Sequence, residues 1–418
     1  MSDVVLCKSV EQVHHPKEDG HRSVAGSSFA VSILAGITLA ASFLSQLAIA
    51  YFFGTGWEMD CYLVAIALPF AIMGVATGGI GFIFIPILTE YQNDKNELQH
   101  LINKSFTLIV AGAGLISLLG CVFGGPLVAL TVSNFPEKKM ILAVSLARII
   151  WVMVGFTILN NFLVALHHFG KVFVFPAATF LLPPLSVLIG SILLAPVIGI
   201  KSVAVAFAMG TFLQFICLLP IITRNRRFEI LLNFNHPGIR KAIFSIVPLL
   251  LSVLPFTILP TIDVFWASRL SDGSISYVGY SNKIIVTFTT VIVQGVSVVL
   301  FPFFSQDAVA GDIIRIRERM LKTTRAVILL AVFPAIIGFV LRVPLLEIIF
   351  ERGRFDKDAV LGIAAVLPFY LLAMAALAQV NITERIFFAF KDFKTIAKTG
   401  RRLFSIVQRA LQSGGGNP

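Results

Sequence analysis

The sequence has 418 residues, of which 57% are hydrophobic and only 13% are charged, and its formal net charge at pH 7 is +11. About a quarter of the residues of an ordinary water-soluble domain are charged, so this composition excludes that class of protein. The basic excess does not indicate nucleic-acid binding, because these residues lie in short connections between apolar runs and form no basic face with interleaved aromatic residues.

Residues 1–27 are polar and lack the apolar core and cleavage site of a signal peptide, which predicts a cytoplasmic N-terminal tail. About ten apolar runs follow, each long enough to cross a bilayer as a helix. The runs do not show the alternation of membrane-barrel strands, so we expect an all-α polytopic membrane protein. The predicted spans are 28–53, 61–88, 105–133, 140–168, 172–196, 202–223, 242–266, 277–304, 326–350 and 358–380.

The distribution of Lys and Arg among the connections predicts the orientation. Basic residues are concentrated in alternate connections, whereas the intervening ones carry fewer or balance them with acids. Under the positive-inside rule, the rich connections and the N-terminal tail lie in the cytoplasm. The rich set consists of Lys95, Lys104, Lys171, Arg224, Arg226, Arg227, Arg240, Lys241, Arg315, Arg317, Arg319, Lys322 and Arg325.

A polar cytoplasmic loop at 224–241 divides the chain into an N-lobe of six spans, 28–223, and a partial C-lobe, 242–394. An internal similarity supports two repeated halves, because "FIFIPILTEYQ" ends the second span and "VVLFPFFSQDA" ends the eighth. Pro86 and Pro302 then occupy equivalent positions. Repeated lobes of this kind typically enclose the substrate path of a transporter.

The residues after the predicted C-lobe, 395–418, form an atypical tail. This tail is basic and amphipathic and too short for another complete span. It is either an interfacial helix or the mark of a truncated or frame-shifted chain, and we favour the second interpretation. In both cases the second lobe is incomplete.

Ionisable residues well inside apolar runs are functional candidates, because a charge in the membrane is costly. They are Arg148, Asp263, Lys283 and Arg342. The sequence contains no Ser/His/Asp, Cys/His or HExxH grouping and no glycine-rich nucleotide loop, and its four cysteines show no metal-binding spacing. We therefore predict no enzyme site, no metal site and no cofactor.

Lys283 lies in the first turns of the eighth span and has two interpretations. In the first, its amine extends to the membrane–water interface. In the second, it faces a hydrated cavity and attracts an anionic substrate, with Asp263 as its partner. For Arg148 and Arg342, two roles stay open: a contact between helices and the lining of a cavity. Asp60 precedes the run "CYLVAIALPF", where capping its own helix is a sufficient role. The stretch "FERGRFDKDAV" is most simply a solvated turn.

Six stretches together resemble the MurJ/MviN family, the lipid II flippases of the MOP exporter superfamily. They occur in the family's order: "FFGTGWEMDCYLVAIALP", "FIFIPILTEY", "IDVFWASRLSDGSISYVGYSNKI", "VVLFPFFSQ", "IFERGRFDKDA" and "ERIFFAFKDFKT". The resemblance implies a two-lobe MOP/MATE-like bundle around a central cationic cavity. It also implies a protein of the bacterial inner membrane that moves a polyprenyl-diphosphate-linked glycan to the periplasmic leaflet by alternating access.

The resemblance also suggests roles for single residues. Lys283, in "YSNKI", falls where the family has a cavity arginine, Asp60 on its aspartate between the first two spans, and Arg385 on the arginine of its R-x-F-Y-A motif. With Asp263 and Arg148, these are the expected substrate-binding residues. Other family arginines are absent from "TLAASFLSQ" and "PFAIMGVATGG". The substrate therefore stays open between lipid II and another lipid-linked glycan, such as an exopolysaccharide unit.

Two rival functions stay open at this point. A cation-coupled multidrug or metabolite antiporter of the MATE type needs membrane carboxylates that bind Na⁺ or H⁺, and Asp263 is almost the only deep candidate. The other rival is a non-functional truncated relative or a scramblase-like scaffold. The expected partners are the lipid-linked glycan and the bilayer, with Na⁺ or H⁺ added if transport is ion-coupled, and no nucleic acid.

Overall fold

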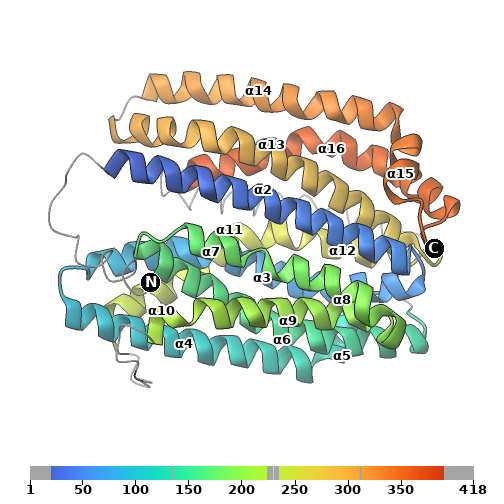
Figure 1. Ribbon diagram of the computed structural model, residues 1–418, viewed down its shortest axis with the longest axis horizontal. Helices are drawn as coiled ribbons and strands as arrows, with labels where there is room; N and C mark the ends of the chain where they lie inside the picture. The colour runs from blue at the N-terminus through green and yellow to red at the C-terminus, as the bar shows by residue number, and fades with distance from the viewer. Residues whose placement is uncertain (1–19, 134, 224–228, 230–234, 311–312, 390–418) are drawn as a thin grey trace, which may run out of the picture.

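The computed structural model describes residues 20–133, 135–223, 229, 235–310 and 313–389, and some side chains within these ranges lie outside the description. The regular structure of the described residues is helical (Figure 1). The helices are α2 (Gly20–Phe53), α3 (Trp57–Glu90), α4 (Lys95–Val122), α5 (Gly124–Ala129), α6 (Glu137–Phe169), α7 (Val174–Thr179), α8 (Leu182–Ile198), α9 (Lys201–Leu218), α10 (Pro220–Thr223), α11 (Pro237–Thr257), α12 (Leu259–Ala267), α13 (Ser274–Ala310), α14 (Ile313–Val340), α15 (Arg342–Phe350) and α16 (Lys357–Ala389).

These helices follow the ten predicted spans, five of which are broken into two helices each: α4–α5, α7–α8, α9–α10, α11–α12 and α14–α15. In the described residues, eight helices are long and apolar enough to cross a membrane. The other two predicted spans fall on α11–α12 and on α13. The latter has 37 residues and is therefore about 55 Å long. All the long helices run roughly along one axis (Figure 1).

The helices form the two groups expected of a two-lobe exporter bundle. In the first, α6 packs against α3, α4 and α9, and α8 packs against α9 and α2. In the second, α16 packs against α13, α14 and α15. Helices α11 and α12 belong to the second half of the sequence but pack on α3 of the first. The predicted boundaries of the lobes remain a prediction, because most of the 224–241 loop and all of the 395–418 tail lie outside the described residues.

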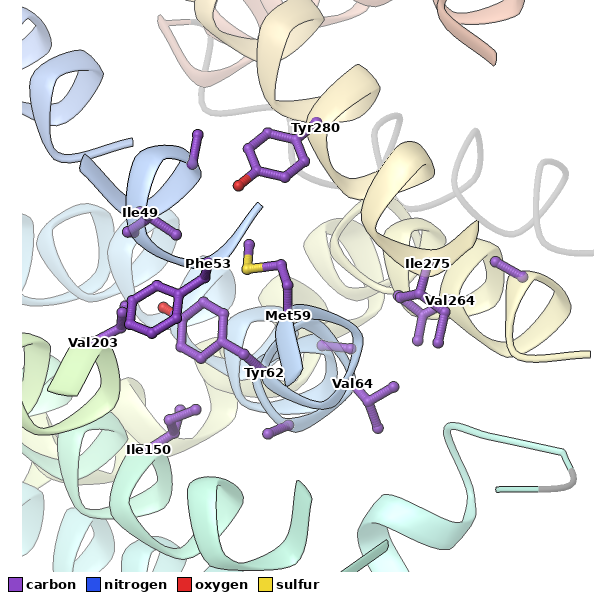
Figure 2. Close-up of a cluster of buried hydrophobic side chains, with 14 of the residues drawn as sticks. Ile49, Phe53, Met59, Tyr62, Val64, Ile150, Val203, Val264, Ile275 and Tyr280 are labelled. Atoms are coloured by element: carbon purple, nitrogen blue, oxygen red, sulfur yellow. The ribbon is translucent and has the colours of Figure 1, made fainter. Parts of the chain in front are cut away.

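One apolar core joins the two groups. Figure 2 shows Phe53, Tyr62 and Val203 packed together near Met59, while Tyr280 approaches Met59 from α13. Large apolar side chains also cover the outside of the bundle, where Leu372, for example, is 78% exposed. Such a surface is suited to lipid rather than to water.

Two ends of the bundle are important for the site. The Asp60 end contains the start of α3, the start of α13 and helix α15, and lies to the right in Figure 1. The Glu90 end contains the end of α3, the start of α4 and the start of α11.

Candidate functional site

At the Asp60 end, a carboxylate of one group caps a helix of the other. Asp60 lies in the first turn of α3 and is only 2% exposed. Its Oδ2 accepts the backbone N–H of Gly273 at 2.7 Å, and its Oδ1 accepts the N–H and the hydroxyl of Ser276 at 2.8 and 2.6 Å. These donors stand at the start of α13, where free N–H groups and the helix dipole favour a carboxylate. The sequence suggested a cap on α3, but the structure shows the carboxylate bound to α13.

Two glycines bring the loop after α2 against the loop after α15. Gly54 has φ +58°, and a Cβ atom there would lie 2.3 Å from the carbonyl oxygen of Arg354. Gly353 has φ +64°, and its Cβ would lie 2.4 Å from the carbonyl oxygen of Tyr51. The Arg354 N–H donates to that Tyr51 oxygen at 2.9 Å, and the Tyr280 hydroxyl donates to the Gly54 carbonyl at 3.2 Å. The two groups are thus joined through backbone that only glycine allows to approach so closely.

The charged stretch 350–360 contributes apolar packing to the same contact. The rings of Phe350 and Phe355 stack with centroids 5.4 Å apart, and both meet the ring of Tyr280. Phe355 is 1% exposed. The Arg354 guanidinium reaches the Glu58 carboxylate of α3 at 3.7 Å. A solvated turn, as the sequence suggested, is therefore an incomplete description of this stretch.

At the Glu90 end, α3, α6 and α11 border a hollow of about 1150 Å³, which lies along the seam where α11 packs on α3. Its lining residues come from three helices and from Phe180, and on α6 and α11 they recur every three or four positions, so one face of each of these two helices borders it. The lining residues are Thr77, Gly81, Phe82, Ile83, Ile85, Pro86, Ile87 and Glu90 of α3, Asn161, Val164, Ala165 and His168 of α6, Pro237, Arg240, Lys241, Phe244 and Ser245 of α11, and Phe180.

Further toward the Asp60 end, the seam is closed. A Cβ atom on Gly74 of α3 would lie 2.7 Å from the Cγ2 of Thr257 in α11, so the two helices are in close contact there. The Thr261 hydroxyl of α12 donates to the Ala67 carbonyl of α3 at 3.2 Å. The hollow therefore ends before it reaches the Asp60 end.

Two ion pairs join α11 to the first group at the Glu90 end. Lys241 pairs with Glu90, and both side chains are about half exposed. The Nε2 atom of His236 lies 3.2 Å from a carboxylate oxygen of Glu97. Because His236 Nδ1 accepts the backbone N–H of Gly238 at 3.0 Å, Nε2 carries the proton and donates to Glu97.

Comparison with known proteins assigns this arrangement to a family. The sequence profile of the lipid II flippase MurJ family matches residues 49–414. The chain belongs to this family. The match includes most of the 395–418 tail, which the sequence analysis treats as atypical.

Individual relatives agree with this assignment. The lipid II flippase MurJ of Burkholderia cenocepacia is 24% identical over 372 residues, which cover 86% of this chain and 72% of that protein. A solved structure of MurJ in an inward closed conformation has a TM-score of 0.77 at 19% identity, covering 88% of this chain and 78% of that one. An inward-facing multidrug resistance MATE transporter of the MOP superfamily has a TM-score of 0.70 at 12% identity, covering 86% and 83%. This MurJ-family chain is thus a multi-pass protein of the bacterial inner membrane with the MOP transporter fold.

The residues that the sequence singled out as cavity residues lie in several places in this MurJ-family fold. Asp60 binds Gly273 and Ser276 at the start of α13, a contact that we call the Asp60 clamp. Asp263 of α12 accepts the Tyr370 hydroxyl of α16 at 2.7 Å, inside the second group. Arg148 is exposed on α6, beside Gly124 at the start of α5. The side chain of Arg385 lies outside the described residues. Their role in substrate binding remains a prediction.

Lys283 lies on α13 between the two ends. Leu63 of α3 contacts Gly279 one turn earlier on α13, so Lys283 is level with residue 67 of α3, about 15 Å along the axis from Thr77. Its side chain is exposed. Lys283 does not line the hollow at the Glu90 end.

The lining of the hollow was not apparent from the sequence, where Arg240 and Lys241 served only as markers of orientation. The available signal was the spacing of Arg240 and Lys241 from Phe244 and Ser245, which places all four on one face of α11. In the described residues, no three His, Cys, Asp or Glu side chains gather in an arrangement that could hold a metal ion.

Proposed function

We propose that this chain moves a lipid-linked glycan, with lipid II as the first candidate, from the cytoplasmic to the outer leaflet by alternating access. The observation that carries the proposal is the asymmetry of the contacts between the two halves of the sequence. The Asp60 end is closed by the Asp60 clamp and the Gly54–Arg354 contact, whereas the Glu90 end opens into a hollow. Family membership supports the same function.

The proposed orientation places the Glu90 end in the cytoplasm. The connection before α11 and the start of α14 carry the densest clusters of Arg and Lys in the sequence, which the positive-inside rule assigns to the cytoplasm. The N-terminus then lies in the cytoplasm, and the closed Asp60 end faces outward. The structure accordingly represents a state that is shut toward the outside.

The chemistry of the cargo explains why this chain needs a cation between its groups. A diphosphate headgroup cannot cross hydrocarbon without compensation, because burying an unpaired charge is very costly. Lys283 has an exposed side chain on α13, which suits a cation that replaces part of the headgroup's hydration. Its neighbours Thr287 and Thr290 follow at helical spacing, so α13 presents a polar stripe.

The lipid tail needs a route that keeps it in the bilayer. Helices α2 and α13 belong to different groups and scarcely touch in the described residues, whereas α3 and α11 are tightly packed. We therefore place the passage of the tail at the seam between α2 and α13. The headgroup can then cross inside the protein while the tail remains in lipid.

A MATE-type antiporter is the weaker candidate. Asp263 is the carboxylate that such a function would use, and its Oδ2 accepts the Tyr370 hydroxyl. The coupling ion, Na⁺ or H⁺, is a separate question that ion-gradient dependence would answer.

Growth of a strain depleted of its own lipid II flippase tests the proposal. We expect this chain to restore growth and to lower the cytoplasmic accumulation of lipid-linked peptidoglycan precursor, with the strain's own flippase as the positive control. If the chain reaches the membrane at the same abundance but neither growth nor precursor level recovers, lipid II is not its cargo.

A further inference from the structure

The hollow at the Glu90 end has cations at an unusual position. Arg240 and Lys241 are the fourth and fifth residues of α11, close to the N-terminus, where the positive end of the helix dipole disfavours cations and favours anions. Lys241 is paired with Glu90 across the seam. No carboxylate is paired with Arg240 among the described residues, and its guanidinium lies 5.7 Å from the centroid of the Phe244 ring. This part of the hollow is therefore suited to an added anion.

The remaining wall is largely apolar. Phe82, Ile85 and Pro86 of α3 and Phe180 face the same space as Phe244. A free glycan would find few hydrogen-bond partners on such a wall, whereas an isoprenoid chain is well matched to it. The volume of about 1150 Å³ is large enough for a diphosphate and several isoprene units.

We propose that this hollow is an entry subsite for the lipid diphosphate portion of the cargo. Arg240 and Lys241 bind the diphosphate, and the wall formed by Phe82, Ile85 and Pro86 contacts the first isoprene units. The arriving anion displaces the Glu90 carboxylate from Lys241. The proposal rests on the proposed function, because it specifies which part of that cargo the chain binds first.

The Lys241–Glu90 pair suits such an exchange. Both partners are about half exposed, and exposed ion pairs stabilise proteins only weakly. A diphosphate offers more charge and can form a bidentate pair with the neighbouring Arg240. Glu90 therefore acts as a competitor that occupies Lys241 until the cargo arrives.

Binding of farnesyl diphosphate to the full chain in phosphatidylcholine nanodiscs tests the subsite. We expect Lys241→Gln to weaken binding roughly tenfold, because a charge-assisted hydrogen bond is lost. We expect Glu90→Gln to tighten binding about two- to fivefold, because an exposed competitor is removed. Lys95→Gln, which removes an exposed charge at the same end outside the hollow, should leave binding unchanged.

The decisive result is that Lys241→Gln and Glu90→Gln change the affinity for farnesyl diphosphate in opposite directions. If the pair merely held α3 to α11, Glu90→Gln and Lys241→Gln would shift binding in the same direction, and the subsite would be refuted. Inorganic diphosphate should bind more weakly than farnesyl diphosphate, since it lacks the apolar arm. If phosphatidylglycerol in the nanodiscs competed for the hollow as strongly as farnesyl diphosphate binds to it, the hollow would be a general anionic-lipid site. That result would also overturn the proposal.

The experiment separates this inference from the proposed function. The chain can restore growth of the flippase-depleted strain while Glu90→Gln and Lys241→Gln change the affinity for farnesyl diphosphate in the same direction. That result would retain the flippase function and reject only the subsite. Diphosphate binding with the expected signs, together with failure to restore growth, would instead retain the subsite and reject lipid II as cargo.

Discussion

At the scale of single residues, the sequence identifies charges but not their partners. Lys283 is conspicuous because it is a cation within an otherwise apolar run, and its side chain is exposed in the structure. Asp60 is equally visible, but its partners Gly273 and Ser276 are more than 200 positions away. The pairing of Glu90 with Lys241 spans 151 positions. Helical spacing reports neighbours only within a helix, so none of these contacts was predictable.

Substitution of Lys283 tests its proposed role. Lys283→Ala should abolish appearance of the lipid-linked glycan in the outer leaflet at unchanged membrane abundance, because the headgroup loses its cation. Lys283→Arg keeps the charge and should preserve transport. Full transport by the alanine variant would show that the amine does not contact the cargo.

Substitution of Asp60 tests the clamp. Asp60→Asn removes the charge that accepts three hydrogen bonds and turns an amide donor toward other donors, so it should destabilise the protein by about 2–3 kcal/mol. Thermal unfolding of the purified protein measures the loss. The matched control is Asp272→Asn, since the Asp272 side chain is 64% exposed and its ion pair with Lys139 is of the exposed kind that contributes little to stability. Equal melting temperatures for both variants would contradict a role for Asp60 in closing this end.

At the scale of elements, hydrophobic runs locate the spans well but not the helix ends. Helix α4 begins at Lys95, ten residues before the predicted span at 105, because Asp94 caps it by accepting the N–H groups of Asn96 and Glu97 at 3.0 and 3.1 Å. The predicted span 242–266 is interrupted at Ile258, and α12 restarts with Pro260 in its first turn. Polar helical extensions and turns within apolar runs leave little signal in hydropathy.

Two glycines of one loop provide a matched test of the close contact near α15. Gly54→Ala would place a methyl group against the Arg354 backbone at a positive φ and should cost at least about 2 kcal/mol. Gly56→Ala should be nearly neutral, because its nearest neighbour would be 4.0 Å away. Melting temperatures of the two purified variants measure the difference. Similar values would mean that the loop after α2 does not pack on the loop after α15 as described.

At the scale of the whole molecule, the fold class followed from composition and the order of motifs, whereas the state of the interface did not. No sequence pattern indicates that the Asp60 end is closed while the seam at the Glu90 end widens, because both depend on contacts between the two halves. The proposed transport nevertheless depends on this asymmetry. Transport by alternating access requires the contacts around Asp60 and Arg354 to separate in each cycle.

Reversible cross-linking of the Asp60 end is the most direct test of this requirement. The side chains of Glu58 and Arg354 approach to 3.7 Å, so Glu58→Cys and Arg354→Cys can be joined by a short cleavable thiol reagent. The background is a chain in which Cys7, Cys61, Cys121 and Cys217 have been replaced. The readout is the amount of labelled lipid-linked glycan that reaches the outer leaflet. We predict that cross-linking stops transport and that cleavage restores it, while each single-cysteine variant is unaffected by the reagent. Undiminished transport by the cross-linked protein would contradict alternating access through this end.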